Sequence, residues 1–326
     1  MSDLWRPCCK LDSLRSRAQM LATIRQFFND RGVLEVETPL LSHGIGTEPQ
    51  LAFFSTEYYL YPDKETLFLQ TSPEFAMKRL LAAGSGSIYQ ISKAFRQGES
   101  GRFHNPEFSL LEWYRTGFDL FQLMTEIELL IHTLFAAQGT LRKTLVTTYR
   151  AVFEHYTGLN PLLFSKADYA DYAAQNGLAD AILICADSHA LWLDFIFSHR
   201  VQPNLGQQGL CMVHGFPACQ SSLARVNAEN SAVADRVEIF IQGVELGNGF
   251  YELTDAVEQE RRFDREIAYR RRNGLPNVDK DRRFLDALVS GLPDCSGMAI
   301  GLDRLLMLLT GADAIDQVLA FPIARA

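Results

Sequence analysis

The stretch from Phe95 to Gly117 concentrates side chains that could bind a polyphosphate. Arg96, Arg102 and His104 lie in a turn-forming segment between two strand-like runs. Guanidinium groups offer paired donors to phosphate oxygens, and a purely structural hairpin needs no such cluster in its turn. The stretch therefore predicts a strand, a long loop and a returning strand, with the loop folding over an anionic ligand.

A second anion-binding pattern lies near the C-terminus, in the run from Gly297 to Leu308. It predicts a strand, a glycine turn and a helix with Arg304 near its start. Helix N–H groups together with a guanidinium make a good anion site. Taken alone, the run also fits a buried helix that carries one stray arginine.

Two glutamates between these segments are further candidates. Alternation along residues 236–242 places Glu238 on a different strand face from the isoleucines. Glu245 follows shortly afterwards, just before two glycines that allow close backbone approach. On this pattern alone, both glutamates could equally be solvated charges.

A helix start carries a third candidate carboxylate. Ser72 is expected as the N-cap, Pro73 as the first helical residue, and Glu74 lies in the first turn. The simplest role of Glu74 is to complement the helix dipole.

The apolar periodicity predicts the elements that must position these residues. A helix is expected from Asp12 or Ser13 to Arg31, followed by a strand from Val33 to Glu37. Further helices are expected at 119–138, 166–175, 188–199 and 254–272, and further strands at 53–60 and 67–70.

The composition describes an ordinary globular protein. The chain has 326 residues, of which 47% are hydrophobic and 21% charged, with a net charge of −8. That charge gives no support for broad nucleic-acid binding, although a local basic patch can sit on an acidic protein. The six cysteines form no C-x-x-C pair, and no run is apolar enough to suggest a signal peptide or a membrane span. We therefore expect a cytoplasmic protein with reduced thiols and no membrane partner.

The segment FRQGESGRFHNPEFSLLEWY resembles motif 2 of the class II aminoacyl-tRNA synthetases, in particular the lysyl enzymes. The first helix and the strand before Pro39 resemble motif 1, which builds the dimer interface of that family, and Gly297 to Leu308 resembles motif 3. The resemblance runs from Leu14 to the C-terminus. It implies an α+β class II catalytic core, an antiparallel sheet flanked by helices, occupying residues 1–326 as a single domain in a homodimer.

The resemblance also implies roles for individual residues. Arg96 and Arg304 would be catalytic, and Glu238 and Glu245 would hold Mg²⁺ on ATP, with hard oxygen ligands as that ion prefers. The substrate-binding residues would be Ser72, Pro73, Glu74, Glu112, Tyr114 and Glu252. The ATP-binding residues would be Arg96, Gln97, Gly98, Glu99, His104, Asn105, Glu245, Leu246, Gly301 and Arg304.

Three features distinguish the chain from lysyl-tRNA synthetases. Ser72 replaces an alanine, Gly98 stands where a glutamate is expected with Glu99 one step later, and motif 1 leaves no room for an N-terminal OB-fold anticodon-binding domain. These features resemble the free-standing paralogues that ligate (R)-β-lysine to elongation factor P.

The expected function is ATP-dependent activation of (R)-β-lysine or lysine as an adenylate, followed by transfer to the ε-amine of a lysine of elongation factor P. Such a ligase releases AMP and pyrophosphate, and tRNA is not the expected acceptor. Two alternatives remain: a truncated lysyl-tRNA synthetase-like enzyme with another acceptor, or a non-catalytic lysine-sensing paralogue. Retention of Arg96, Glu238, Glu245 and Arg304 argues against the sensor, because sensing needs no pyrophosphate clamp.

Overall fold

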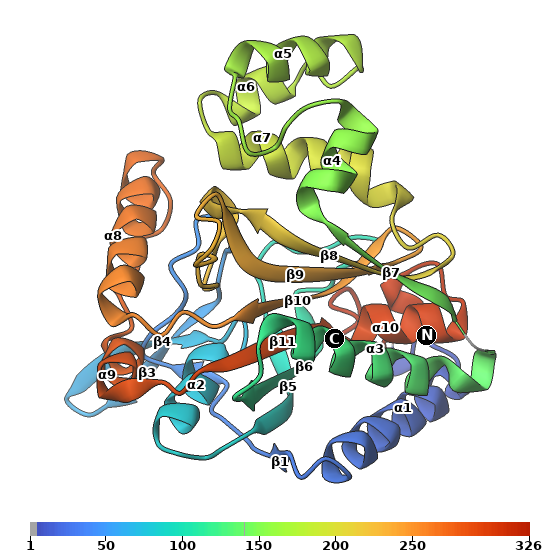
Figure 1. Ribbon diagram of the computed structural model, residues 1–326. Helices are drawn as coiled ribbons and strands as arrows, with labels where there is room; N and C mark the ends of the chain where they lie inside the picture. The colour runs from blue at the N-terminus through green and yellow to red at the C-terminus, as the bar shows by residue number, and fades with distance from the viewer. Residues whose placement is uncertain (1–4, 140) are drawn as a thin grey trace. The chain divides into compact units, whose positions relative to one another are not determined.

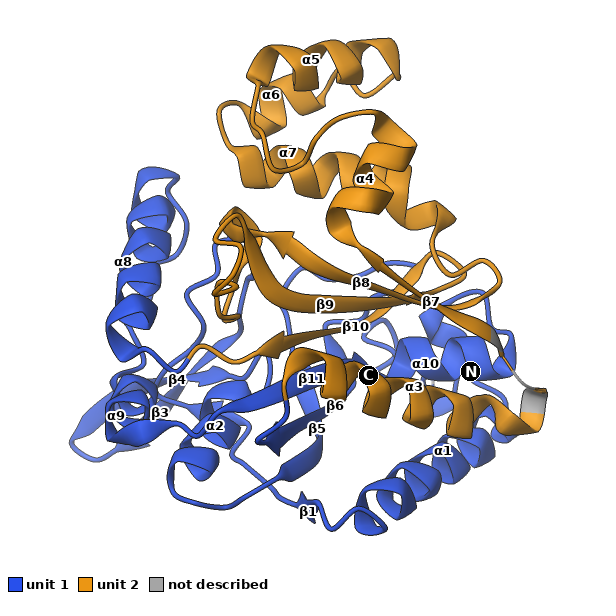
Figure 2. Cartoon of the chain, viewed as in Figure 1, with its two compact units in different colours: residues 1–118, 254–326 blue, residues 119–253 orange. Residues whose placement is uncertain are grey.

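The computed structural model describes residues 5–139 and 141–326. The chain divides into two compact units, one formed by residues 1–118 and 254–326 and the other by residues 119–253 (Figure 2). Unit 2 is therefore inserted into unit 1 along the sequence. No helix in the described part of the chain is long and apolar enough to cross a membrane.

Unit 1 contains four strands of a mixed sheet in the order β1-β5-β6-β11. Their bounds are Leu34–Glu35 for β1, Ile88–Phe95 for β5, Glu107–Thr116 for β6 and Cys295–Gly301 for β11. The pairs β5–β6 and β6–β11 are antiparallel, whereas β1 pairs with β5 in parallel. The long β5–β6 hairpin confirms the strand, loop and strand predicted around Arg96.

Two helices pack beside this sheet (Figure 1), α1 at Leu11–Asn29 and α10 at Leu302–Thr310. The helix expected before Arg31 is thus confirmed, but Lys10 stands at its N-cap in place of Asp12 or Ser13. The strand expected at Val33–Glu37 is wrong in length, since only two residues form β1. Phe28 of α1 stacks on Tyr89 of β5 with ring centroids 4.5 Å apart, which anchors the helix to the sheet.

The rest of unit 1 is a small sheet and three helices. Strands β2 (Leu41–Ser42), β4 (Asp63–Leu69) and β3 (Ser55–Leu60) form an antiparallel sheet. Helices α2 (Glu74–Ala82), α8 (Ala256–Arg272) and α9 (Arg282–Gly291) join through aromatic contacts. Phe75 of α2 stacks on Phe284 of α9 at 4.4 Å, and Phe263 of α8 lies 5.8 Å from Phe75.

Unit 2 begins with α3 (Leu120–Phe135), whose start is fixed by Asp119 and Gln122 in a reciprocal capping box. Its strands lie in the order β10-β9-β8-β7, at Val244–Tyr251, Val233–Ile241, Gly209–Pro217 and Arg142–Thr148. Antiparallel pairing joins β10, β9 and β8, but β7 pairs with β8 in parallel. The expected α+β architecture is confirmed, with a parallel pair in each unit that the sequence did not predict.

Four helices of unit 2 share a buried core with β8 and β9. They are α4 (Tyr149–Thr157), α5 (Lys166–Gln175), α6 (Ala181–Cys185) and α7 (His189–Ile196), which continues into a π-helical turn at Phe197–Val201. Tyr149, Trp192 and Phe240 belong to their shared core of buried side chains. The helix predicted at 166–175 is confirmed to the residue, and that predicted at 188–199 begins at its Ser188 cap.

Candidate active site

The start of α2 positions the predicted substrate-binding segment. The Ser72 hydroxyl accepts a hydrogen bond from the Glu74 N–H at 3.2 Å, while Pro73 occupies the N-cap position itself. The cap is therefore one residue later than predicted, although Ser72 still serves the helix start. The Glu74 carboxylate accepts from Lys78 Nζ at 2.6 Å, and Lys78 is only 1% exposed. Any substrate amine bound at Glu74 must share this carboxylate with a buried lysine.

The buried pair Glu112 and Tyr114 on β6 lies in the same part of unit 1. The Tyr114 hydroxyl donates to Glu112 Oε1 at 2.7 Å, and Glu112 is 2% exposed. Lys78 Nζ lies 6.0 Å from the Tyr114 ring centre. The structure thus brings Glu74, Glu112 and Tyr114 to one polar region around Lys78. The sequence analysis did not single out Lys78, although Lys78 lies four residues after Glu74, at the spacing of helical neighbours.

The motif 2 loop orients Arg96. Its guanidinium lies 3.5 Å from Glu99 and 5.1 Å from the Phe108 ring centre, and its Nε is buried with no hydrogen-bond partner among the described residues. Gly98 adopts a φ of +82°, a conformation that favours glycine, so the turn brings Glu99 back to Arg96. Glu99 in this position pairs with the arginine that is expected to bind the substrate.

Motif 3 contacts the same loop within unit 1. Arg304 Nε donates to the Phe103 carbonyl at 3.2 Å, and Arg304 Nη2 contacts His104 Nε2. Asn105 is buried, donates to the Glu107 carbonyl at 2.6 Å and accepts from the Ile323 N–H at 3.0 Å. Asn105 therefore holds the loop in shape. Gly301 is the N-cap of α10, so the helix N-terminus adjoins Arg304.

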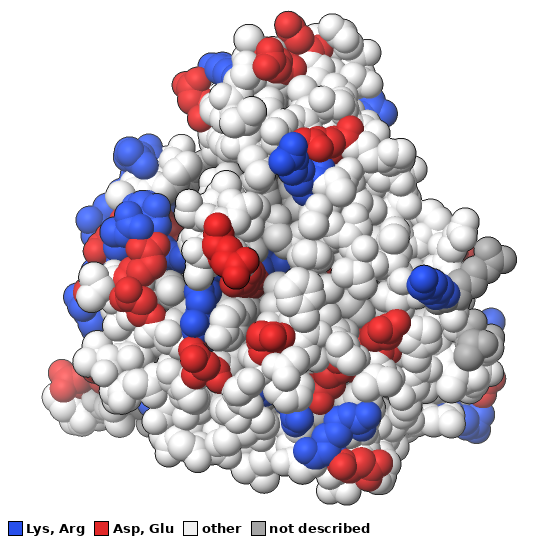
Figure 3. Space-filling view, viewed as in Figure 1, with Lys and Arg blue, Asp and Glu red and all other residues white. Residues whose placement is uncertain are grey.

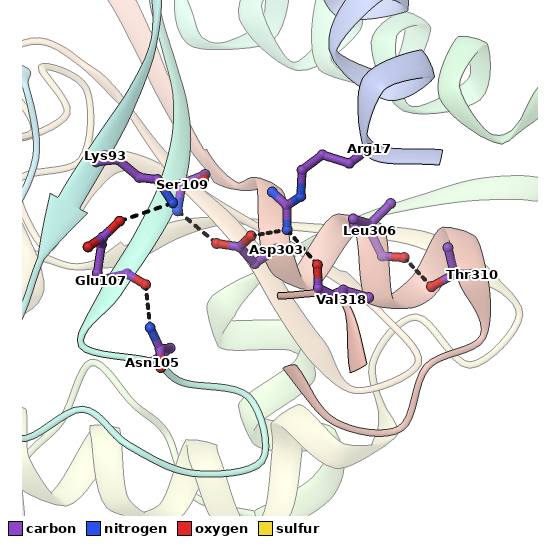
Figure 4. A network of polar contacts seen from close by, with 9 residues as sticks. All are labelled: Arg17, Lys93, Asn105, Glu107, Ser109, Asp303, Leu306, Thr310 and Val318. Carbon is purple, nitrogen blue, oxygen red and sulfur yellow. Dashed lines mark hydrogen bonds and ion pairs between the residues drawn. The ribbon is translucent and has the colours of Figure 1, made fainter. Parts of the chain in front are cut away.

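The residue before Arg304 is a buried carboxylate, Asp303, whose contacts are shown in Figure 4. Asp303 accepts from Arg17 Nη2 at 2.5 Å and from the Ser109 N–H at 2.7 Å, and it is 2% exposed. Arg17 also donates to the Val318 carbonyl at 3.1 Å. Sequence reasoning missed this contact because its members are far apart along the chain.

Thr47, Glu48 and Glu266 form a further cluster that no sequence pattern predicted. Thr47 Oγ1 donates to Glu266 of α8. Desolvation and the repulsion of Glu266 raise the pKa of Glu48 to about 7, with Glu74 adding to this effect and Arg96 opposing it. The cluster therefore lies within electrostatic reach of Glu74 and Arg96.

Unit 2 positions the two predicted magnesium ligands on β9 and β10. Glu238 Oε1 accepts from Arg236 Nη2 at 2.5 Å. Burial raises the pKa of Glu238 to about 8, the positive charge of Arg236 opposes this shift, and Glu245 adds to it. Glu238 thus senses the charge of Glu245, and the structure brings the two carboxylates into one region.

Arg236 and Asp194 are polar neighbours of these carboxylates that sequence reasoning missed. Arg236 Nε donates to Asn248 Oδ1 at 3.1 Å, and Arg236 Nη1 donates to the Gln220 carbonyl at 2.7 Å. Gln220 Nε2 in turn donates to Asp194 Oδ1 on α7 at 2.5 Å. The alternation that selected Glu238 also places Arg236 on the same strand face, which could have identified this pair.

The remaining predicted residues of unit 2 are buried on β10 or beside its end. Leu246 and Glu252 are each 1% exposed. The Glu252 carbonyl accepts from Arg225 Nε at 3.2 Å and Arg225 Nη2 at 3.1 Å. The segment that ends at Arg225 thus holds the Glu252 backbone in place.

The donor set in unit 2 fits a magnesium ion that is completed by substrate. Within the described residues, no group of three or more His, Cys, Asp or Glu side chains is placed to hold a metal. Magnesium, however, is commonly bound by one or two carboxylates together with substrate phosphates. Glu238 and Glu245 provide such a partial set, and a cation would relieve the repulsion between them.

Comparison with known proteins identifies the family of the chain. The family model for tRNA synthetases class II (D, K and N) matches residues 3–325. The chain belongs to this family. A relative from Haemophilus ducreyi is 45% identical, covering 99% of this chain and 97% of the relative, and is named elongation factor P–(R)-β-lysine ligase. Relatives with that name from Pasteurella multocida (44%; 99% and 98% covered) and Vibrio atlanticus (45%; 100% of both) are similar over their full lengths.

The family model and these relatives confirm the family resemblance drawn from the sequence motifs.

The raised pKa of Glu238 predicts a pH dependence of stability. The folded value is about 8 against an ordinary value of 4.5, so the folded chain holds a proton that the unfolded chain releases. The free energy of unfolding should therefore fall as pH rises from about 5 to about 8. Glu238→Gln should decline less over this window when unfolding by urea is measured at both ends.

Glu229→Gln, which alters an exposed carboxylate of the same unit, serves as the matched control. An unfolding free energy that declines as steeply in Glu238→Gln as in the unaltered protein would contradict the assignment.

Proposed function

We propose that this protein is a ligase that activates (R)-β-lysine or lysine with ATP and transfers it to the ε-amine of a lysine of elongation factor P. The names of the full-length relatives and the class II family support this function. The observation that carries it is the guanidinium pair of unit 1. Arg96 presents a buried Nε donor, and Arg304 is held against the same loop at His104.

In the first step, a carboxylate oxygen of the amino acid attacks the α-phosphorus of ATP. An oxygen–phosphorus bond forms, and the bond to pyrophosphate breaks. Arg96 would stabilise the negative charge on the carboxylate and α-phosphate, while Arg304 at the N-terminus of α10 would bind the terminal phosphate. Magnesium held by Glu238 and Glu245 would neutralise the phosphate charge. Most of the catalysis is then positioning and electrostatic stabilisation.

In the second step, the acceptor lysine amine attacks the carbonyl carbon of the adenylate. A carbon–nitrogen bond forms, AMP leaves, and the amine loses a proton. The protein needs no nucleophile of its own, because the adenylate is already activated. His104, Gln97 and Asn105 act on this scheme as residues that shape the nucleotide site.

Recognition of a lysine-type substrate requires carboxylates for its ammonium groups, since a buried ammonium without a partner is costly. We assign Glu252 to the distal ammonium, and Glu74 with Ser72 to the amine near the carboxylate. Glu112 and Tyr114 complete the polar region around Lys78. Lys78 neutralises the negative charge of Glu74 when no substrate amine is bound to Glu74.

We further propose that residues 1–326 act as one catalytic domain in a cytoplasmic homodimer. Leu11 of α1, Leu34 of β1 and Leu41 of β2 are 64%, 57% and 44% exposed, which suits a surface covered by a second copy. All six cysteines are free thiols, as expected in a reducing compartment. Light scattering that gives the mass of one chain would exclude the dimer.

Replacing Arg96 tests the activation step. Arg96→Ala should lower lysine-dependent exchange of pyrophosphate into ATP by about 10²–10³-fold, because one donor to the transition-state charge is lost. Arg79→Ala, which removes an exposed arginine on α2, should leave the exchange rate unchanged. Full exchange activity in Arg96→Ala, with normal thermal unfolding, would rule out the proposed role of motif 2.

Replacing Ser72 tests the choice of amino acid. Its hydroxyl lies beside Glu74 and takes up space where the lysyl enzymes have alanine, so we expect the unaltered protein to prefer the β-amino isomer. Ser72→Ala should shift the ratio of kcat/KM values, measured by exchange, toward α-lysine. An unchanged ratio would show that Ser72 does not select the amino acid and only accepts the hydrogen bond at the start of α2.

A further inference from the structure

The outer face of α8 carries an exposed stripe that no step of the proposed reaction uses. Val257, Arg261, Arg265, Ala268 and Arg272 follow one another at helical spacing, and all are exposed. Val257 is 79% exposed. Figure 3 shows lysine and arginine side chains gathered over this helix, with acidic side chains beside them.

This stripe has more positive charge than its own acids neutralise. The Glu258 carboxylate lies 2.5 Å from Arg261, 2.9 Å from Arg262 and 3.6 Å from Arg265. A single negative charge therefore forms ion pairs with three guanidinium groups. Arg271 and Arg272 have no ion-pair partner among the described residues. Nine of the 31 Lys and Arg residues fall in 256–283, in a chain whose net charge is −8. Six acidic residues fall in the same range, and two of the nine cations, Arg262 and Arg270, are buried. The positive charge of α8 that faces solvent is therefore carried by Arg261, Arg265, Arg271 and Arg272.

The inner face of the same helix is built into the part of unit 1 that carries candidate site residues. Phe263 packs near Phe75 of α2, the helix that begins with Glu74. Arg270 is 1% exposed and donates to the Glu48 carbonyl at 2.9 Å, while Glu266 accepts from Thr47. A molecule held on the outer face would thus be fixed to the same unit as Glu74 and Arg96.

We propose that the outer face of α8, from Val257 to Arg272, docks the acceptor protein of the proposed reaction through an acidic surface on that protein. The inference rests on the proposed function, because it assigns a surface to the acceptor that this function requires. Opposite charges across such a surface mainly raise the association rate and orient the partner.

The side chains of the stripe favour a protein partner over a nucleic acid. Exposed Val257 and Ala268 interrupt the arginines, and Asp264 lies on the adjoining row, paired with Lys280 at 2.8 Å. Apolar and acidic groups at these places suit a mixed protein surface and would weaken phosphate binding. The helix has 17 residues, about 25 Å of length, which spans one side of a small protein domain.

The test neutralises the two arginines without ion pairs. Arg271→Gln/Arg272→Gln should lower kcat/KM for purified elongation factor P by roughly tenfold at low ionic strength, and the difference should vanish as salt screens the charges. Lysine-dependent pyrophosphate exchange should be unchanged, because no candidate site residue is altered. Arg271→Lys/Arg272→Lys keeps both charges at the helix C-terminus and should restore transfer.

The matched control is Arg79→Gln/Lys143→Gln, which removes two exposed cations from other elements. The inference is overturned if transfer by the α8 variant equals that of the unaltered protein, falls equally at every salt concentration, or falls no more than in the control. A loss of exchange in the α8 variant, or a loss of tRNA binding without loss of transfer, also overturns it. If the unaltered protein exchanges pyrophosphate but labels no elongation factor P, the proposed acceptor fails and the inference fails with it.

Discussion

The buried carboxylate of Asp303 is the contact on which the arrangement of unit 1 depends. It binds Arg17 of α1 at 2.5 Å and the backbone of Ser109 on β6 at 2.7 Å, and it stands in the first turn of α10. Three segments from the beginning, middle and end of the chain thus meet at one side chain (Figure 4). Leaving one partner of such a buried pair without the other typically costs about 3–5 kcal/mol, so the contact strongly selects this arrangement. Arg304 is the next residue after Asp303, so the contacts of Asp303 also place Arg304 against the motif 2 loop.

The charged residues of the candidate site already have partners inside the protein. Glu74 pairs with Lys78, Arg96 with Glu99, and Glu238 with Arg236. Substrate binding on the proposed scheme exchanges these partners for ammonium, carboxylate and phosphate groups. The repulsion between Glu238 and Glu245, and between Glu48 and Glu266, leaves each unit with carboxylates that a cation would stabilise.

Local patterns predicted much of the fold, because they record contacts between near neighbours in the chain. The β5–β6 hairpin, the helix expected at 119–138 and the strand–turn–helix around Arg304 all carried such patterns. The length of strand β1, which has two residues, was overestimated because its pairing with β5 is a long-range contact. Parallel pairing of β1 and of β7 was likewise invisible in the sequence.

The same distinction applies to the candidate site. Its residue types followed from motifs, but their partners did not. Arg17 and Asp303 are 286 residues apart, and Thr47 and Glu266 are 219 apart, so no spacing rule relates them. Lys78 and Arg236 were within reach of helical and strand periodicity, but the sequence analysis singled out only the glutamates beside them.

In the proposed function, the activated amino acid passes to a protein and not to tRNA. The most direct measurement incubates the protein with ATP and radiolabelled (R)-β-lysine or lysine, offers elongation factor P and tRNA(Lys) together, and separates the products. We expect label on elongation factor P, bound as an amide that survives mild base, with AMP and pyrophosphate released. Label on tRNA, or adenylate formation without label on either acceptor, would contradict it.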